Sequence, residues 1–224
     1  MSWQEMGFEK QTTKWPRPLA ESFYRRPTAI VARSLIGKTL LHRSDDRIVG
    51  GVIVETEAYL ADGDPACHAA RGMTPRNATM FGPPGRLYVY TIHAKYCLNA
   101  VTQRAGVGSA VLIRAIQPRW GVPQMQQRRG QQATDRLCRG PSMLCQALAI
   151  DLQHDGVSLT EDSSIWIGRA VERIATERII AVPRIGISQA KDLPLRFLLQ
   201  DSPFVSGPKY WHRTEARSQS PPMG

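Results

Sequence analysis

The stretch VGGVIVETE, residues 49–57, is the segment that most clearly predicts a β-strand. It is rich in β-branched residues, which suit the pleated backbone of a sheet. Alternate side chains of a strand share a face, so Glu55 and Glu57 point the same way and Val54 points the other way. If Val54 marks the core, both glutamates face a groove. The alternative is an edge strand whose acidic side chains are solvated.

Further apolar or β-branched runs on both sides of this stretch predict more strands. They cover residues 39–42, 87–92, 109–116, 164–167 and 179–187. Helical spacing of apolar residues or basic character predicts helices over 21–40, 122–129 and 142–150. Strands and helices intermix without regular βα alternation, which favours a single α+β domain over a doubly wound sheet. We expect a loose lead-in over residues 1–20, the domain over 21–206 and a flexible tail over 207–224.

The charge of the chain indicates a polyanionic partner. Its 224 residues include 29 Lys and Arg against 19 Asp and Glu, giving a formal net charge of +10. Hydrophobic residues make up 42%, enough for a core, so a disordered chain is excluded. A basic surface kept only for solubility is the alternative, but a soluble protein this basic more often meets nucleic acid.

The basic residues also have an uneven distribution. No acidic residue occurs from residue 65 to residue 134. The stretch contains nine basic residues: Arg71, Arg76, Arg86, Lys95, Arg104, Arg114, Arg119, Arg128 and Arg129. Acidic side chains repel phosphates, so this pattern suits a surface that follows a nucleic-acid backbone.

Cysteine usage and hydropathy favour a cytosolic protein. The four cysteines, at 67, 97, 138 and 145, form no CxxC motif. We interpret them as reduced, buried thiols and expect no metal site. No apolar run approaches the ~20 residues that span a bilayer, and the first 17 residues lack the apolar core of a signal peptide. We expect a cytoplasmic protein, at the nucleoid in a bacterium or in the nucleus of a eukaryote, with no membrane contact.

Glu57 and Arg114 are the candidates for chemistry. A carboxylate on the nucleic-acid face of a basic protein weakens binding, so it is retained mainly where the reaction needs a base. A glycosidic bond breaks through an oxocarbenium-like transition state, which one carboxylate can stabilise while it directs a water at the sugar. Arg114 lies in the apolar run 109–116, and a buried arginine needs a partner. We expect that partner to be Glu57, bridged by the water it activates.

Aromatic residues close to Glu57 in sequence are candidates for a base-binding pocket. They are Tyr59, His68, Tyr88 and Tyr90. A base removed from the stack rests on the π faces of such side chains. For any one of them, a place in the core or at its rim is the alternative.

These residues stand in blocks that resemble the alkyladenine (3-methyladenine) DNA glycosylase family. The resemblance runs from about residue 23 to 206 and keeps order and spacing. The matching blocks are RSLIGKTLL (33–41), IVETEAYL (53–60), TPRN (74–77), MFGPPGRLYVY (80–90), VLIRA (111–115), CRGPSMLCQALAI (138–150) and RIGI (184–187). Each block alone is weak, but the set together is specific.

The resemblance implies a fold, a reaction and a set of roles. The fold is one domain around a curved antiparallel sheet with flanking helices and a protruding β-hairpin. The reaction is hydrolysis of the N-glycosidic bond of alkylated or deaminated purines in double-stranded DNA, by a monomer without cofactor or metal. Glu57 resembles the general base and Arg114 its partner. The pocket residues implied are Tyr59, His68, Tyr90 and Asn99, of which Asn99 crowds the exocyclic amine of normal guanine.

This sequence departs from the family in two places, and the first of them, in the hairpin, lies among the residues that we expect to contact DNA. The residues we expect to contact DNA are Arg71, Arg76, His93, Lys95 and Tyr96. His93 stands where the family has an intercalating tyrosine, Ala94 and Lys95 replace glycine and methionine, and the loop is one residue shorter. Met143 stands where the family usually has a lysine.

Two other functions fit parts of the sequence. One is a nucleic-acid-binding module without activity, since the sheet also resembles the RNA-binding C-terminal domain of formyltransferases. The other is a glycosidase or nuclease that acts on RNA. A buried carboxylate gives a pure binding module no advantage, so Glu57 argues against the first. Preference for duplex DNA without metal would exclude the second.

Overall fold

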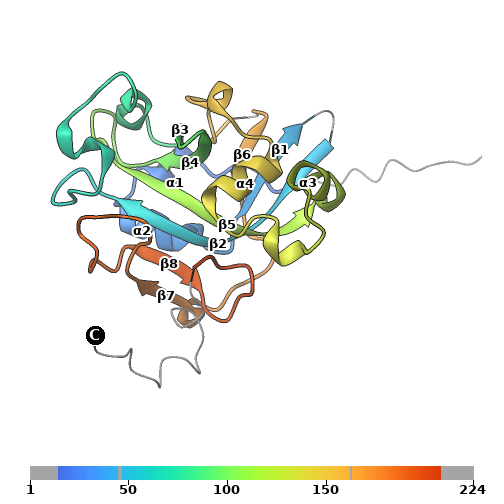
Figure 1. The fold of residues 1–224 in the computed structure, drawn as a ribbon. Coiled ribbons are helices and arrows are strands. Elements are labelled where there is room, and N and C mark those ends of the chain that lie inside the picture. Colours follow the sequence, from blue (N-terminus) through green and yellow to red (C-terminus); the bar gives the residue numbers. More distant parts are fainter. Residues whose placement is uncertain (1–14, 45–46, 162, 208–224) are drawn as a thin grey trace, which may run out of the picture.

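An antiparallel sheet forms the centre of the protein (Figure 1). The computed structural model describes residues 15–44, 47–161 and 163–207. Within them the strands are β1 (Thr39–Ser44), β2 (Arg47–Tyr59), β3 (Leu87–Ile92), β4 (Lys95–Val101), β5 (Ala110–Trp120), β6 (Ile165–Gly168), β7 (Ile179–Val182) and β8 (Arg196–Leu199). The main path runs β3-β4-β5-β2-β1-β6, while β8 pairs with both β2 and β7. The α+β single-domain prediction is confirmed.

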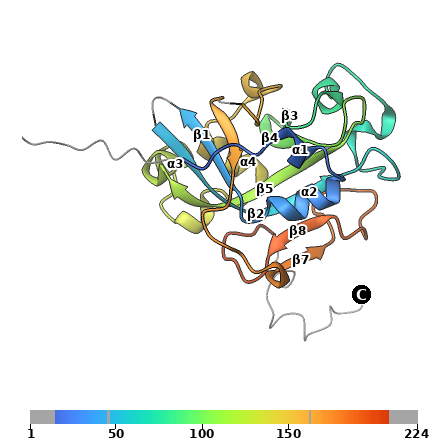
Figure 2. The ribbon, with the colours of Figure 1, turned by 180° about the vertical axis from the view of Figure 1, so that it is seen from behind.

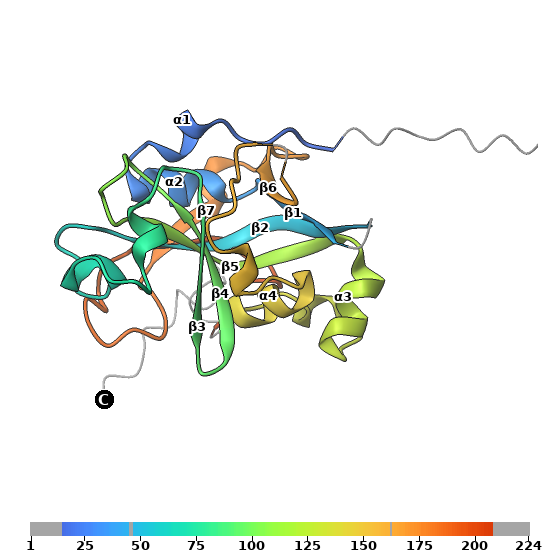
Figure 3. The same ribbon diagram turned by 90° about the horizontal axis from the view of Figure 1, so that it is seen from above.

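Helices cover both faces of this sheet (Figure 3). They are α1 (Glu21–Tyr24), α2 (Thr28–Leu35), α3 (Val122–Arg129) and α4 (Pro141–Leu148), joined by five single turns of 3₁₀ helix: His68–Arg71, Ala78–Phe81, Thr134–Arg136, Leu152–His154 and Thr176–Arg178. Seen from behind, α2 lies along β2 and β8 (Figure 2). On the opposite face α4 packs on β4 and β5, and α3 packs on α4.

The prediction of one helix over residues 21–40 is wrong. Two short helices occur instead, and the chain has already entered β1 at Thr39. Pro27 is the N-cap residue of α2, and the residue before a proline is driven away from helical backbone angles. The first helix therefore ends before Pro27.

β2 is the strand that the rest of the sheet surrounds. β5 pairs along it from Gly50 to Tyr59, β1 pairs with its first half, and β8 pairs with residues 55–57. The pairing with β5 shifts register at Gly50/Gly51 and again around Glu55. A Cβ on Gly51 would lie 2.0 Å from the carbonyl oxygen of Gln117, so only glycine fits this close approach. With both faces covered, β2 is buried from Val49 to Ala58.

β3 and β4 form a hairpin whose end extends away from the sheet (Figure 3). Ile92 pairs with Lys95, which leaves His93 and Ala94 as the two turn residues. Their φ angles are 47° and 58°. Two positive φ values define a turn that matches strand twist and usually contains Asn or Gly. His93 is exposed at the tip.

Part of the predicted lead-in and part of one predicted strand differ from the expectation. Part of the predicted lead-in, residues 16–19, lies along β6: Pro18 bridges Gly168, and Leu19 donates its N–H to the Ile167 carbonyl at 2.9 Å. Residues 1–14 and 208–224, which include most of the predicted lead-in and tail, lie outside the described residues. β7 ends at Val182, so the second half of the strand predicted over 179–187 is a loop. No helix of the described residues is long and apolar enough to cross a membrane.

Candidate active site

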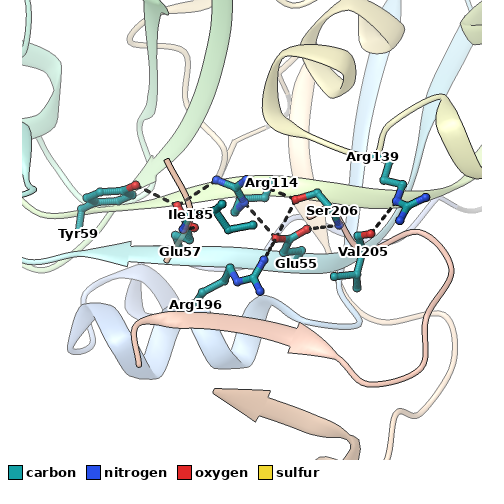
Figure 4. Close-up of polar contacts among 9 residues, drawn as sticks. All are labelled: Glu55, Glu57, Tyr59, Arg114, Arg139, Ile185, Arg196, Val205 and Ser206. Atoms are coloured by element: carbon teal, nitrogen blue, oxygen red, sulfur yellow. Dashed lines mark hydrogen bonds and ion pairs between the residues drawn. The ribbon is translucent and has the colours of Figure 1, made fainter. Parts of the chain in front are cut away.

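Two buried carboxylates lie at the centre of the sheet. Glu55 and Glu57 follow each other on one face of β2, between β5 and β8, and neither has any exposed surface. The solvated edge strand is therefore excluded. The expectation that both face an open groove is also wrong, because β8 and the segments before and after it enclose them (Figure 4).

Three donors hold the carboxylate of Glu57. Its Oε2 accepts hydrogen bonds from the hydroxyl of Tyr59 at 2.9 Å and from Nη1 of Arg114 at 3.1 Å, and its Oε1 accepts from the backbone N–H of Ile185 at 2.9 Å. The pairing of Glu57 with Arg114 is confirmed. The water expected between them is not, since the two side chains bind each other directly (Figure 4).

Arg114 is a fixed cation in this site. Burial alone lowers the pKa of Arg114, but Glu57 and Glu55 outweigh burial and raise it above its ordinary value. The guanidinium donates to Glu55 through Nε at 3.0 Å, to Glu57 through Nη1 and to the hydroxyl of Ser206 through Nη2 at 3.3 Å. Each nitrogen of its fork thus has its own acceptor.

An aromatic pocket lies next to Glu57. It has a volume of about 420 Å³, within the roughly 300–1,000 Å³ typical of small-molecule sites. The structure brings together the four pocket residues that the resemblance implied, Tyr59, His68, Tyr90 and Asn99. Tyr88, the further aromatic candidate, also lines the pocket, and the structure adds Arg71, Ile92 and residues 186–189. A small second core that includes Cys67, Met80 and Tyr88 supports its back.

The aromatic side chains of the pocket favour their neutral forms, and hydrogen bonds and ring contacts hold several of them in place. Burial lowers the pKa of His68 and raises those of Tyr59 and Tyr90, so all three favour their neutral forms. The rings of His68 and Tyr90 meet edge to face with centroids 4.5 Å apart. Nδ1 of His68 and the hydroxyl of Tyr88 share a hydrogen bond of 3.0 Å. Asn99 donates through Nδ2 to the Tyr88 carbonyl at 3.1 Å.

The residues predicted to contact DNA divide by position. Arg71, Arg76, His93 and Lys95 are exposed, and Arg71 lines the pocket. Tyr96 is half-buried and packs against the main core. The side chains of the first four are therefore open to solvent, while Tyr96 is partly covered.

Sequence reasoning missed three buried residues around this site. Asp64 and Arg184 form an ion pair whose guanidinium lies 4.7 Å from the ring centroid of Tyr59. Arg196 pairs with Glu55 at 3.0 Å. Arg196 stands in the apolar run LRFLL, the same signal that singled out Arg114. Asp64 and Arg184 are loop residues, and nothing in the pattern around them indicates burial.

The side chains that commonly bind metals do not cluster in the part of the chain that the structure describes. Among residues 15–44, 47–161 and 163–207, no group of three or more His, Cys, Asp or Glu side chains could hold a metal ion. All four cysteines are free and buried, as predicted from their spacing.

Comparison with known proteins assigns the family. The model of the methylpurine-DNA glycosylase family matches residues 22–203, the part of the chain that contains the two carboxylates, Arg114 and the pocket. The chain belongs to this family. It is a DNA glycosylase, a hydrolase of N-glycosyl bonds that acts in base excision repair, and the resemblance inferred from the sequence blocks is confirmed.

Bacterial relatives of this glycosylase match over most of its length. A protein of Rhodopirellula baltica is 49% identical over 89% of this chain and 87% of its own length. One of Chlorobium phaeobacteroides is 46% identical over 85% and 96%, and one of Carboxydothermus hydrogenoformans is 45% identical over 84% and 98%. Each carries the name "Putative 3-methyladenine DNA glycosylase".

Proposed function

We propose that this glycosylase turns an alkylated or deaminated purine out of duplex DNA and hydrolyses its N-glycosidic bond with a water that Glu57 activates. The observation that carries the proposal is the position of Glu57. Its carboxylate is held by Arg114 and Ile185 and bonded to Tyr59, which is itself a wall of the aromatic pocket. A carboxylate adjoins the place where a flipped base would rest.

The pocket suits a damaged purine better than a normal one. Electron-rich faces of tyrosine attract a ring that carries positive charge, as 3-methyladenine and 7-methylguanine do. Hypoxanthine and ethenoadenine are neutral, and we propose that they bind the same pocket by stacking on its aromatic side chains. Asn99 is fixed by its bond to the Tyr88 carbonyl, and we assign it the exclusion of normal guanine, whose exocyclic amine it would crowd.

The reaction needs one general base, which we assign to Glu57. The bond between C1′ and the purine nitrogen breaks and its electron pair leaves with the purine. The oxygen of water bonds to C1′, and Glu57 takes the proton. An N-alkylated purine carries a positive charge and leaves as a neutral molecule. A neutral purine such as hypoxanthine leaves as an anion, which takes a proton from solvent. Glu57 has no exposed surface in the free protein, so the proposal requires the water to reach its carboxylate when the base occupies the pocket.

The remaining parts of the proposal concern partner and place. The exposed cations Arg71, Arg76 and Lys95 lie in the acid-free stretch, where they suit the phosphates on either side of a lesion. We propose that one copy of the chain acts on double-stranded DNA, in the cytoplasm at the nucleoid of a bacterial cell.

The test is Glu57→Gln, assayed by single-turnover excision of 7-methylguanine and hypoxanthine from a duplex. The amide keeps the shape but cannot take the proton, and a positioned base contributes about 10²–10⁴ in rate. We expect a loss of at least about 100-fold with binding to the same duplex retained or strengthened. Glu177→Gln, an exposed glutamate outside the pocket, controls for the loss of charge. A rate above a tenth of wild type would remove Glu57 from this role.

A further inference from the structure

Glu55 is the more completely bonded of the two buried carboxylates. Its Oε1 accepts from Nε of Arg114, from Nη1 of Arg196 and from the hydroxyl of Ser206, at 3.0, 3.0 and 2.9 Å. Its Oε2 accepts from the backbone N–H of Ser206 at 2.7 Å. Four donors from three elements therefore converge on one side chain that has no exposed surface.

Arg114 connects this carboxylate to Glu57. The guanidinium is planar and its donors form a rigid fork, so the direction of one N–H bond determines the directions of the others. Nε points to Glu55 and Nη1 points to Glu57 (Figure 4). When Glu55 fixes Nε, it also fixes the N–H that holds Glu57.

Charge balance explains the presence of Arg196. Glu55 and Glu57 lie two residues apart on one face of β2, and Arg114 alone would leave this buried group with a net negative charge. Arg196, opposite Glu57 in the β2–β8 pairing, supplies the second cation. Its Nε and Nη2 have no hydrogen-bond partner among the described residues. A buried guanidinium bonded this sparsely costs stability, so stability alone does not account for it.

The segment that holds Glu55 from the other side is itself anchored. Arg139 donates through Nε to the carbonyl of Val205 at 2.8 Å, and it forms a β-bridge with Ala115, the neighbour of Arg114. Residues 205–206 are thus tied to β5 and to β2 together (Figure 4). Their place next to Glu55 is determined by the fold.

We propose that Glu55 is a positioning residue for excision, which orients Arg114 so that Arg114 holds the general base. Arg196 balances its charge, and Ser206 fixes its carboxylate. The inference rests on the proposed function of Glu57. It gives a role in excision to Glu55, which does not line the pocket and has no exposed surface for contact with DNA.

The first test compares Glu55→Gln with wild type in single-turnover excision of 7-methylguanine, with rate constant and amplitude measured separately. With enzyme in saturating excess over the duplex, the rate constant does not depend on how much of the enzyme is folded, and an amplitude equal to that of wild type shows that all of the duplex is bound and processed. A group misplaced by about 1 Å can lose about 100-fold in rate. We expect the rate constant to fall by about 10- to 100-fold while affinity for a duplex with an abasic-site analogue changes by less than threefold.

Two further variants serve as a control for stability and as a substitute in case Glu55→Gln does not fold. Thr56 lies between the two glutamates, and its hydroxyl donates a hydrogen bond to the Ala32 carbonyl on the opposite face of β2. Thr56→Val removes this hydrogen bond. It controls for lost stability, and its rate constant should stay at the wild-type value. Ser206→Ala keeps the backbone N–H but loses the hydroxyl. It serves if Glu55→Gln does not fold, with an expected loss of about threefold or more in rate constant, since a net hydrogen bond is worth about 0.5–1.5 kcal/mol.

The last test asks whether Glu55 acts through Glu57. Glu57→Asp shortens the base, so Arg114 no longer holds it correctly even with Glu55 present. We expect the loss from Glu55→Gln to be clearly smaller in the Glu57→Asp background than in wild type. Equal losses in both backgrounds, or a wild-type rate constant for Glu55→Gln, would overturn the positioning role. Failure of the proposed function is separate: it shows as a rate above a tenth of wild type for Glu57→Gln.

Discussion

The guanidinium of Arg184 binds the carboxylate of Asp64 through two hydrogen bonds of 2.6 Å, and both side chains are fully buried. Asp64 also accepts the backbone N–H groups of Leu60 and Ala66. The pair therefore ties the loop that begins at Pro183 to the turn that follows β2. Ile185 lies in this loop, and Tyr59, the last residue of β2, directly precedes this turn. Ile185 and Tyr59 are two of the three donors to Glu57.

Asp64→Asn should destabilise the protein strongly. Removing one member of a buried ion pair leaves the other uncompensated, which costs about 3–5 kcal/mol. Urea unfolding at pH 7 measures the free energy. Asp62→Asn, an exposed acid in the same turn, is the matched control and should stay within about 0.5 kcal/mol of wild type. A loss below about 1 kcal/mol for Asp64→Asn would show that the pair contributes little net stability.

The same carboxyl should give a distinct dependence of stability on acid. Burial by itself raises the pKa of Asp64, but hydrogen bonds from Arg184, Leu60 and Ala66 and the charge of Arg184 lower it overall from 3.8. A carboxyl with a depressed folded pKa stabilises above its unfolded value and loses that contribution as pH falls through the folded value. The stability gap between wild type and Asp64→Asn should be constant above about pH 5 and shrink below pH 3.8. A gap that does not change with pH would contradict this assignment.

The sequence could predict the parts of the site that depend on local pattern. β2, β3, β5 and α3 follow from β-branched or apolar runs and from a basic helical stretch, and the structure places all four where they were predicted. Arg114 follows from its place in an apolar run, since a buried arginine needs an acidic partner. Its pairing with Glu57 was therefore predictable, but its second bond to Glu55 was not.

The rest of the site depends on tertiary contacts that local sequence patterns do not predict. Four-residue β8 is too short for a periodic signal, yet its pairing with residues 55–57 encloses both carboxylates. Ser206 and Ile185 bind them through backbone N–H groups, which every residue except proline carries. Only the tertiary path of the chain determines which N–H groups arrive there.

Binding to undamaged duplex should weaken steeply with salt. Five of the nine basic residues in the acid-free stretch are occupied within the protein. Arg114 is buried, Arg119 pairs with Glu172, and the other three donate to backbone carbonyls: Arg86, Arg128 and Arg129. The exposed cations Arg71, Arg76, Lys95 and Arg104 remain. Four phosphate contacts, at about 0.9 each, give a slope near −3.6 for log K against log salt. The measurement is fluorescence anisotropy between 50 and 300 mM salt, roughly the range over which such contacts are lost.

Single substitutions localise that effect. Lys95→Ala should reduce the magnitude of the slope by about 1, as expected for one lost phosphate contact. Lys191→Ala, an exposed cation outside the stretch, should leave it unchanged. A wild-type slope shallower than about −1 would show that this surface does not face the DNA backbone.

His93 at the tip of the β3–β4 hairpin should hold open the gap that a flipped base leaves. His93 is exposed and is the first residue of a two-residue turn, where its φ angle is 47°. Its neighbour Ile92 is 47% exposed and lines the pocket. The hairpin thus extends from the pocket to the surface that we expect to bind DNA. Unpairing a base costs a few kcal/mol, less when it is mismatched. His93→Ala should therefore slow excision most where the lesion is well paired.

The measurement is single-turnover excision of hypoxanthine opposite T, its weaker partner in the duplex, and opposite C, where it pairs well, for wild type, His93→Ala and His93→Tyr. We expect His93→Ala to lose more rate on the well-paired duplex than on the other, because the cost of extrusion is larger there. His93→Tyr, which supplies a larger ring at the same turn position, should keep the wild-type rate on both. Arg136→Ala, an exposed cation outside the hairpin, controls for a general loss of surface contacts. Equal rates for His93→Ala and wild type on both duplexes would exclude His93 as the wedge and transfer that role to Lys95 or to the exposed side of Tyr96.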